Sequence, residues 1–276
     1  MWASLTRPRW KALLVAAPST GGDAGGLFHG TRMWGAVVNR NGELCTFATS
    51  TADPTHVRPG SQAIAKAKAY TANAFSLDSL ALSTARLYTF SQPGHSLWTL
   101  GQSNLFNPEF LAPPSGQGGG KDRIAGGLIL FRGGVPLYEP GGDIVGGLGI
   151  SGDTSCTDHE IAKRVRTLAV LNPPGGALVD DITYTVPDGA SVYTHPRCPN
   201  TWRNGVFIGN EANATGYDGL KRASVGPPPG MSPAAKRLAI CDHRPTVTPV
   251  LPLRPVPLST KGIHSDLPRL ARNDSR

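Results

Sequence analysis

Two short motifs each pair a cysteine with a histidine at the same spacing. Cys156 stands three positions before His159, and His195 stands three positions before Cys198. Thiolate and imidazole groups separated by two residues have a spacing that zinc sites use. A disulfide between Cys156 and Cys198 explains the same two cysteines, and two unconnected thiols explain them equally well. The sequence therefore offers zinc binding by Cys156, His159, His195 and Cys198 as one of three interpretations.

A second group of polar residues lies where a predicted strand leads into a predicted helix. The strand ends in Gly-Ile-Ser-Gly at residues 149–152, and Thr157 stands three residues before Glu160, as in a capping box. The free amide groups at a helix N-terminus favour an anion. We therefore expect the anionic group of a ligand to lie between residues 149–152 and 157–159.

An enzymatic interpretation draws on the same region. Lys68, Asp158 and His159 are the candidate acid–base residues, Asp153 is a further carboxylate partner, and the amides of residues 151–152 would form an anion hole. Such a set would support proton abstraction or elimination on a small oxygenated carboxylate metabolite. The chain has no Gly-x-Ser-x-Gly elbow, so a serine nucleophile is not expected.

The elements that would position these groups begin with a β-hairpin. The apolar run Trp34–Asn39 is followed by Arg-Asn-Gly, and an Asn-Gly pair favours the tight turn whose twist suits a hairpin, so residues 43–49 are expected to return as a second strand. A helix capped by Ser61 is then predicted over Ser61–Phe75. Residues 77–90 are expected to form a second helix, or the second half of one bent helix.

Residues 125–152 form a glycine-rich β-segment. Short β-prone runs at 125–131, 132–138 and 143–152 are punctuated by glycines, which predicts an antiparallel meander with tight turns. Glycines inside a strand, such as Gly147 and Gly149, let another backbone or a flat ligand approach closely. A helix from Thr157 to about Leu171 is expected to follow the meander.

The connection at residues 91–123 is far longer than the usual loop of about 4–6 residues. It contains Trp98, Leu100 and Phe106, which make it too apolar for a fully solvated segment. We therefore expect a lid over the site or an arm that contacts another subunit.

Four motifs occur in an order that is typical of one family. They are Val-Val-Asn-Arg-Asn-Gly-Glu-Leu-Cys in the hairpin, Ala-Ile-Ala-Lys-Ala-Lys-Ala-Tyr-Thr-Ala in the helix, Gly-Gly-Val-Pro-Leu-Tyr, and Gly-Gly-Leu-Gly-Ile-Ser-Gly with Asp158 beyond. In this order they resemble the GlcG/HbpS haem-binding family, which also includes the C-terminal domain of PduO-type proteins. The resemblance implies an α+β, profilin-like domain over residues 34–172, with an antiparallel sheet flanked by helices and assembly into homo-oligomers.

The resemblance also implies a function. It points to binding of haem, a related tetrapyrrole or another small ligand, with a role in redox or haem sensing. Imidazole is the commonest haem ligand, so His95, His159 and His195 are the candidates for binding the iron, with a polar surface position or a satisfied hydrogen bond as the alternative reading of each. His95, which lies beside Pro93 and Gly94 in the long connection, is the first choice among them. The family's ligand pocket corresponds, residue by residue, to Lys66, Lys68, Thr71, Gly134, Pro136, Ser151, Gly152 and Asp158.

The ends of the chain differ from its middle. Residues 1–33 show no sign of the N-terminal helix that the family usually has, and we expect them to form a poorly ordered lead. Residues 173–218 are moderately apolar and are expected to pack on the domain. Residues 219–276 hold ten prolines and ten Lys or Arg against three Asp or Glu, which predicts a basic, disordered tail.

Charge and hydropathy exclude two classes of partner. Residues 1–218 carry 17 basic and 16 acidic groups, so they have no basic stripe of the kind that a phosphate backbone requires, and nucleic acid is not an expected partner. No run approaches the roughly 18 apolar residues that span a bilayer, so membrane insertion is not expected. The apolar run at residues 12–17 is too short for a signal peptide. A cytoplasmic location is therefore favoured over secretion.

Overall fold

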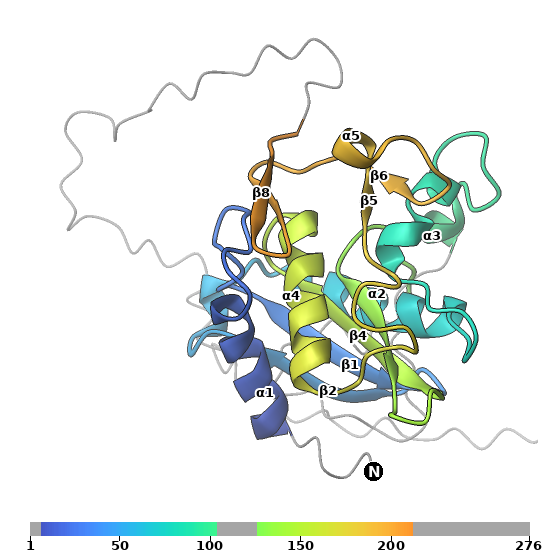
Figure 1. Ribbon diagram of the computed structural model, residues 1–276. Coiled ribbons are helices and arrows are strands. Elements are labelled where there is room, and N and C mark those ends of the chain that lie inside the picture. Colours follow the sequence, from blue (N-terminus) through green and yellow to red (C-terminus); the bar gives the residue numbers. More distant parts are fainter. Residues whose placement is uncertain (1–6, 104–125, 212–276) are drawn as a thin grey trace, which may run out of the picture. The chain divides into compact units, whose positions relative to one another are not determined.

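A four-stranded antiparallel sheet with helices on both faces forms the centre of the protein (Figure 1). The computed structural model describes residues 7–103 and 126–211. Helix α2 (Ser61–Phe75) covers one face of the sheet, and helices α1 (Arg7–Ala16) and α4 (Ser155–Leu168) cover the other. The predicted α+β class is confirmed. The strand order is β2-β1-β4-β3, with β1 at Trp34–Asn39, β2 at Leu44–Thr49, β3 at Gly134–Tyr138 and β4 at Ile144–Ser151.

The predicted hairpin is present as strands β1 and β2. Trp34 pairs with Thr49, and Ala36 pairs with Phe47. At the turn, the Gly42 amide donates a hydrogen bond of 2.9 Å to the carbonyl of Asn39, and Gly42 has a φ of +88°, which a glycine adopts without steric cost. The other edge of β1 pairs with β4, so the hairpin places β1 in the middle of the sheet.

Alternate side chains of the strands enter two separate apolar clusters, because successive residues of a strand point to opposite faces. The cluster under α1 and α4 includes Trp10, Leu14, Val37, Leu148, Ile150 and Ile161. The cluster under α2 includes Trp34, Ala36, Val38, Phe47, Ala65 and Ala69. The sheet is therefore covered by apolar contacts on both faces.

The glycines of β4 allow the backbone of α2 to pack close to the sheet. A Cβ atom at Gly149 would overlap the backbone of Ala65, and one at Gly147 would overlap the carbonyl of Ala69. The alanines of the helix and the glycines of β4 thus bring two backbones together. Of the two predicted reasons for these glycines, the structure shows the approach of another backbone.

The expectation of a poorly ordered lead is wrong for residues 7–33. Helix α1 buries Trp10 and Leu14 completely in the cluster beneath α4, and the 3-10 turn η2 (Ala17–Ser19) follows it. The amides of Leu27, Phe28 and Gly30 then donate to the Asp153 carboxylate at 2.6 to 3.2 Å. The physical reason for the error is that α1 has only two fully buried anchors and no strong amphipathic pattern.

Two further sequence-based expectations are corrected. Residues 77–90 contain the 3-10 turns η4 (Thr84–Leu87) and η5 (Thr89–Ser91) rather than an α-helix. The Ser76 hydroxyl both donates to the carbonyl of Leu82 and accepts from its amide, which favours a closed loop over a helical turn. Residues 126–131 are not a strand, because the amide of Ile129 donates to the Thr71 hydroxyl at 3.0 Å.

The described part of the C-terminal extension packs on the domain through a third apolar cluster, in which Ile182 and Tyr184 meet Ala85 and Cys156. Arg166 and Asp180 add a fully buried ion pair of 2.7 Å. The remaining elements are η3 (Pro54–His56), α3 (Leu100–Ser103), β5 (Thr183–Tyr184), α5 (Thr185–Asp188), β6 (Thr194–His195), β7 (Thr201–Arg203) and β8 (Val206–Gly209).

Two of the predicted segments lie wholly or partly outside the described residues. The predicted tail at 219–276 lies outside them, and so do residues 104–123 of the predicted lid or arm. Within the described residues, no helix has the length and apolar character needed to cross a membrane.

Candidate functional site

Lys68 and Asp158 form an ion pair inside the domain. The Nζ atom of Lys68 lies 2.7 Å from Oδ2 of Asp158 and 3.0 Å from the carbonyl oxygen of Ile150. The other carboxylate oxygen, Oδ1, accepts the amide of Asp153 at 3.0 Å. The Lys68 side chain has 0% exposure and that of Asp158 has 3%, so the pair is closed to solvent.

Burial governs the electrostatics of this pair. It lowers the pKa of Lys68 and raises the pKa of Asp158, because both charged forms lose hydration, and the attraction between the two groups opposes both shifts. Each group thus depends on the other to remain charged. Removing one partner of such a pair leaves an uncompensated buried charge.

His159 does not share the site of Lys68 and Asp158. Its Nε2 atom lies 3.4 Å from Oδ1 of Asp181, which belongs to the C-terminal extension, and Lys163 lies 2.8 Å from the same carboxylate. Complete burial lowers the pKa of His159. Burial works to raise the pKa of Asp181, but His159 and Lys163 hold it well below its usual range. The three predicted acid–base candidates therefore divide between two separate sites, the Lys68–Asp158 pair and the surroundings of Asp181.

The predicted anion site at the start of α4 is filled by the protein's own carboxylates. Asp158 takes the amide of Asp153, and Asp153 takes the amide of Thr154 at 2.7 Å. The helix begins at Ser155 with Thr154 as its N-cap, three residues earlier than the capping box expected at Thr157. These amides therefore already have partners.

The other residues implied by the family resemblance are dispersed around α2 and the sheet. Lys66 lies over the Phe47 ring at 4.4 Å, and burial lowers its pKa to about 8. The amide of Gly134 donates to the hydroxyl of Thr84, in η4, at 2.9 Å. Pro136 pairs with Gly147 inside the sheet. Ser151 and Gly152 are both buried, at the end of β4 and just beyond it.

A pocket of about 390 Å³ lies beside the Lys68–Asp158 pair. Phe131 lines this pocket and also lies over Lys68, with its ring centroid 5.1 Å from Nζ. Thr71 fixes the same wall through its bond to Ile129. Lys68, Thr71 and Asp158 therefore lie behind the wall of the pocket. The pocket is lined by Tyr88, Ser91, Gln92, Leu97, Trp98, Thr99, Gly101, Leu128, Ile129, Leu130 and Phe131.

His95 lies at the edge of this pocket and is exposed. Its amide donates to the carbonyl of Gln92, and its own carbonyl accepts the amide of Trp98, both at 3.1 Å. Gln92 and Trp98 line the pocket, whereas His95 does not. Tyr88 does line the pocket, and the sequence does not single it out, because a helix is expected over residues 77–90.

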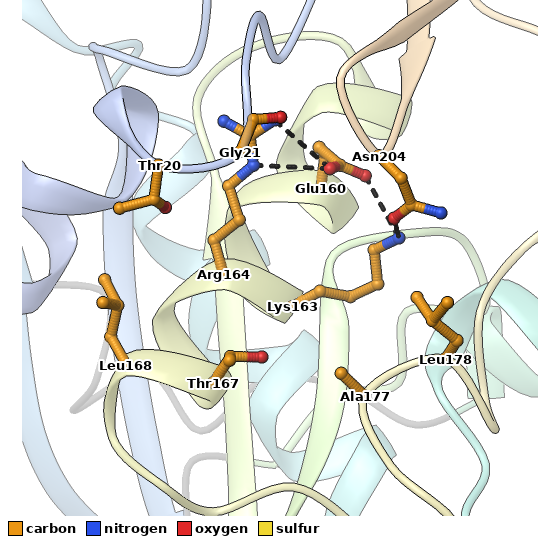
Figure 2. A pocket seen from close by; sticks show the side chains of 10 residues that line it. All are labelled: Thr20, Gly21, Glu160, Lys163, Arg164, Thr167, Leu168, Ala177, Leu178 and Asn204. Carbon is orange, nitrogen blue, oxygen red and sulfur yellow. Dashed lines mark hydrogen bonds and ion pairs between the residues drawn. The ribbon is translucent and has the colours of Figure 1, made fainter.

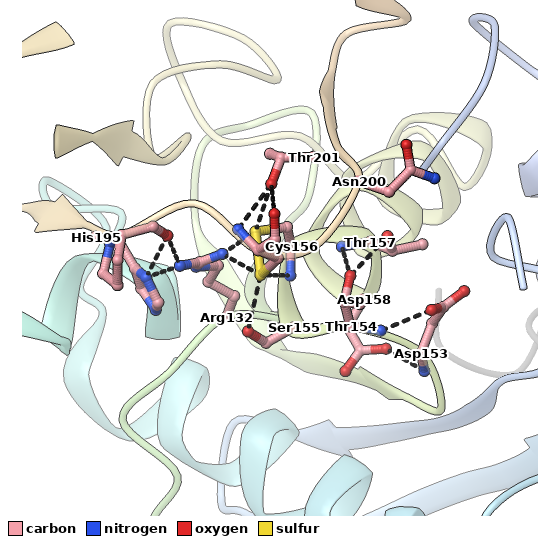
Figure 3. The surroundings of a disulfide bond; sticks show 12 residues. Arg132, Asp153, Thr154, Ser155, Cys156, Thr157, Asp158, His195, Asn200 and Thr201 are labelled. Carbon is pink, nitrogen blue, oxygen red and sulfur yellow. Dashed lines mark hydrogen bonds between the residues drawn. A yellow bond between two sulfur atoms is a disulfide. The ribbon is translucent and has the colours of Figure 1, made fainter. Parts of the chain in front are cut away.

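The two cysteines of the mirrored motifs form a disulfide, Cys156–Cys198 (Figure 3). The guanidinium of Arg132 contacts both sulfurs and the Nδ1 atom of His195. It therefore occupies the place between these groups that a zinc ion would need. Among the described residues, no three His, Cys, Asp or Glu side chains are arranged to hold a metal. Of the three sequence interpretations, the structure shows the disulfide, and His159 lies apart at Asp181.

A second pocket, of about 330 Å³, lies along α4 and was not predicted (Figure 2). Its charged residues already bind one another: Lys163 lies 3.1 Å from Glu160, and Arg164 lies 3.3 Å from the same carboxylate. Arg164 also donates to the carbonyls of Gly21 and Gly22. These charges join α4 to the N-terminal segment, so we assign no ligand to this pocket.

Comparison with known proteins gives a family and a set of similar structures. The PduOC–haem complex is 21% identical over 58% of this chain and 90% of that one, with a TM-score of 0.40. The Klebsiella pneumoniae protein ORFY is 19% identical over 60% and 88%, with a TM-score of 0.40, and HbpS is 21% identical over 59% and 89%, with a TM-score of 0.38. No curated protein matched. The model of the family described as haem degrading protein HbpS-like matches residues 26–166, about half of the sequence, and the chain therefore belongs to the HbpS-like family.

Proposed function

We propose that this protein binds haem, or a closely related tetrapyrrole, in the pocket between residues 88–101 and 128–131. The proposal rests on the apolar and aromatic side chains that line this pocket. Trp98, Phe131 and the leucines at 128 and 130 supply aromatic and aliphatic surface, and the pocket volume lies within the range of about 300–1,000 Å³ that is usual for small-ligand sites. Membership of the HbpS-like family supports the same ligand.

The polar groups of the pocket fit a haem in two respects. Tyr88 supplies a phenol, which is one of the side chains that hold haem iron in proteins. None of the described lining residues is charged, so the propionates of a bound haem would remain at the open side of the pocket. The bound group would supply redox-active iron, and the protein would supply the apolar walls and the iron ligand.

Tyr88 is the ligand that the geometry favours, and His95 is the alternative. Tyr88 faces the pocket and is stacked on His195, with 4.0 Å between ring centroids, so its ring is held in place. His95 is an exposed residue of the rim. A ligand from Tyr88 requires no rearrangement of the chain, whereas one from His95 requires its turn to fold inwards.

Titration of the full chain with haemin, followed by absorbance in the Soret region, tests the proposal. The wild-type chain should saturate at one haem per chain, and Tyr88→Phe should change the spectrum and weaken binding by at least tenfold. Tyr70→Phe, on α2, is the matched control and should bind like the wild type. No Soret shift with the wild-type chain refutes haem binding. A changed spectrum in His95→Ala, with an unchanged one in Tyr88→Phe, assigns the iron to His95 instead.

We also propose that the chain assembles into homo-oligomers, as its family resemblance implies. Trp98 is 51% exposed at the edge of the pocket, and a large exposed apolar side chain is a frequent feature of contact surfaces. Light scattering of the full chain should give a mass that is a multiple of 29.0 kDa, and Trp98→Ser should lower it. A monomeric wild-type chain refutes the assembly without affecting the haem proposal.

A further inference from the structure

Hydrogen-bond donors surround both sulfurs of the Cys156–Cys198 disulfide (Figure 3). The Nη1 atom of Arg132 lies 2.6 Å from Sγ of Cys198 and also contacts Sγ of Cys156. The amide of Cys156, in the first turn of α4, donates to Sγ of Cys198 at 3.2 Å, and the Ser155 hydroxyl lies 3.5 Å from the same sulfur. The Thr201 hydroxyl lies 3.6 Å from Sγ of Cys156 and donates to the carbonyl of Cys198 at 2.7 Å.

These donors suit an anionic sulfur better than a neutral one. Neutral sulfur is a weak hydrogen-bond acceptor, whereas bonds from charged donors to an anion are among the strongest in proteins. Cys198 receives the helix amide and the Ser155 hydroxyl in addition to Arg132, although the contact of Arg132 with Cys156 is the closer of its two. Cys198 is therefore the sulfur whose thiolate these groups would stabilise most.

Arg132 itself needs an anion. Its residue exposure is 1%, and its Nε atom has no hydrogen-bond partner. Burial lowers the pKa of its guanidinium to about 10, so it remains charged at neutral pH. Within residues 7–103 and 126–211, no carboxylate forms an ion pair with Arg132, and its polar contacts are the two sulfurs, His195 and the carbonyl of Pro196. The Tyr184 ring lies 5.5 Å from the guanidinium, and the carboxylates of Asp158 and Glu211 act on it only from beyond ion-pair distance.

A buried cation without a counter-ion is unfavourable, and a thiolate at Cys198 would supply the missing charge. Stabilisation of the reduced form makes a disulfide easier to reduce. From this geometry we propose that Cys156 and Cys198 are a redox-active pair, which a dithiol reductant converts into a thiol at Cys156 and an Arg132-paired thiolate at Cys198.

The exchange balances in two steps. One thiol of the dithiol loses its proton to solvent, and the resulting thiolate forms a bond to the sulfur of Cys156 and breaks the Cys156–Cys198 bond, so that Cys198 leaves as the thiolate. The second thiol of the reductant loses its proton and attacks its own sulfur in the mixed disulfide, and Cys156 leaves and takes up a proton. Two electrons pass from the dithiol to the cysteine pair, the reductant becomes a disulfide, and one proton is released to solvent.

Equilibration of the full chain with mixtures of reduced and oxidised dithiothreitol tests the proposal. All chains would carry Cys45→Ser and Cys241→Ser, so that only the pair reacts, and the thiols would be trapped by acid and alkylation and counted by mass spectrometry. The wild-type pair should be half reduced at a ratio of reduced to oxidised dithiothreitol at least tenfold lower than Arg132→Gln requires. The matched control Arg197→Gln removes a neighbouring arginine that contacts the Ile208 carbonyl, and it should behave like the wild type.

A second measurement examines the thiolate directly. In Cys156→Ser, the absorbance of the Cys198 thiolate at 240 nm should persist below pH 7, and Ser155→Ala, which removes one donor from the sulfur, should move its loss to higher pH. This measurement remains available if Arg132→Gln does not fold. Equal half-reduction ratios for the wild type and a folded Arg132→Gln would overturn the proposal, and so would a Cys198 thiol that ionises only above pH 8.

Discussion

Replacing Lys68 with methionine removes one partner of the buried pair and keeps the length of the side chain. The variant leaves the Asp158 carboxylate without its cation and leaves the carbonyl of Ile150 without the bond from Nζ. Breaking a buried ion pair from one side costs about 3–5 kcal/mol. Since the exposure of the two side chains is 0% and 3%, solvent does little to reduce that cost, and we expect the free energy of unfolding to fall by about this amount at pH 8.

The pH dependence of the same variant follows from Asp158. Burial raises the pKa of this carboxyl, and without Lys68 nothing nearby of opposite charge opposes the shift as strongly. A group whose folded pKa is raised contributes stability at low pH that is lost as pH rises through that value. The deficit of Lys68→Met should therefore shrink as pH falls from 8 to 5, by at most about 1.4 kcal/mol per pH unit.

Urea denaturation at several pH values, followed by circular dichroism, measures both effects. The double variant Lys68→Met/Asp158→Asn removes both charges, and it should be more stable at pH 8 than Lys68→Met alone. A loss of less than about 1 kcal/mol in Lys68→Met, which is the range of an exposed ion pair, would contradict this prediction. A deficit that is the same at pH 5 and pH 8 would contradict it as well.

Three further predictions concern packing and titration. Gly149→Ala should destabilise the fold by about 3 kcal/mol or more, because the backbone of Ala65 cannot withdraw, whereas Gly60→Ala, with open space around it, should stay within about 0.5 kcal/mol; chemical denaturation measures both. Trp10→Ala should cost about 3–5 kcal/mol if α1 is part of the core, and Val15→Ala, on the exposed side of α1, should cost far less; equal effects would contradict the burial of the helix. Burial lowers the pKa of Lys66 to about 8, so between pH 8 and pH 10 the unfolded chain binds more protons than the folded one, and the free energy of unfolding should rise over this range. Lys66→Met should remove this rise. An unchanged slope in the variant would contradict the prediction.

The parts of the fold that could be predicted are those whose signals are local. The Asn-Gly turn specifies the β1–β2 hairpin, and the helical spacing of Ser61–Phe75 specifies α2 with its observed bounds. Helix α1 could not be predicted because its two buried residues, Trp10 and Leu14, are stabilised by contacts with the sheet and not by a local sequence pattern. The Ser76 hydroxyl closes a loop through its two hydrogen bonds to Leu82, six residues along the chain. The spacing of apolar residues, from which a helix is predicted here, carries no information about such bonds.

In the candidate site, the sequence could identify single residues but not the contacts between them. Lys68 and Asp158 could each be singled out, but their contact joins residues 90 positions apart and depends on the packing of α2 beside β4. The cysteines could be paired only as one of three alternatives, since spacing does not state which groups meet. Arg132, which the sequence shows only as the start of a glycine turn, is the residue that decides among them by lying between the sulfurs and His195.

The location of the proposed haem pocket follows from the glycines of β4. Because Gly147 and Gly149 admit the backbone of α2, that face of the strand is filled by the protein itself and has no room for a flat ligand. Residues 128–131 then cross the end of this layer, held to α2 by Thr71, and Phe131 closes over Lys68. The outer side of the same segment is apolar and faces Tyr88 and Trp98. The segment that seals the buried ion pair thus also forms the wall against which a tetrapyrrole would bind, and a bound ligand would meet Phe131 before it could meet Lys68.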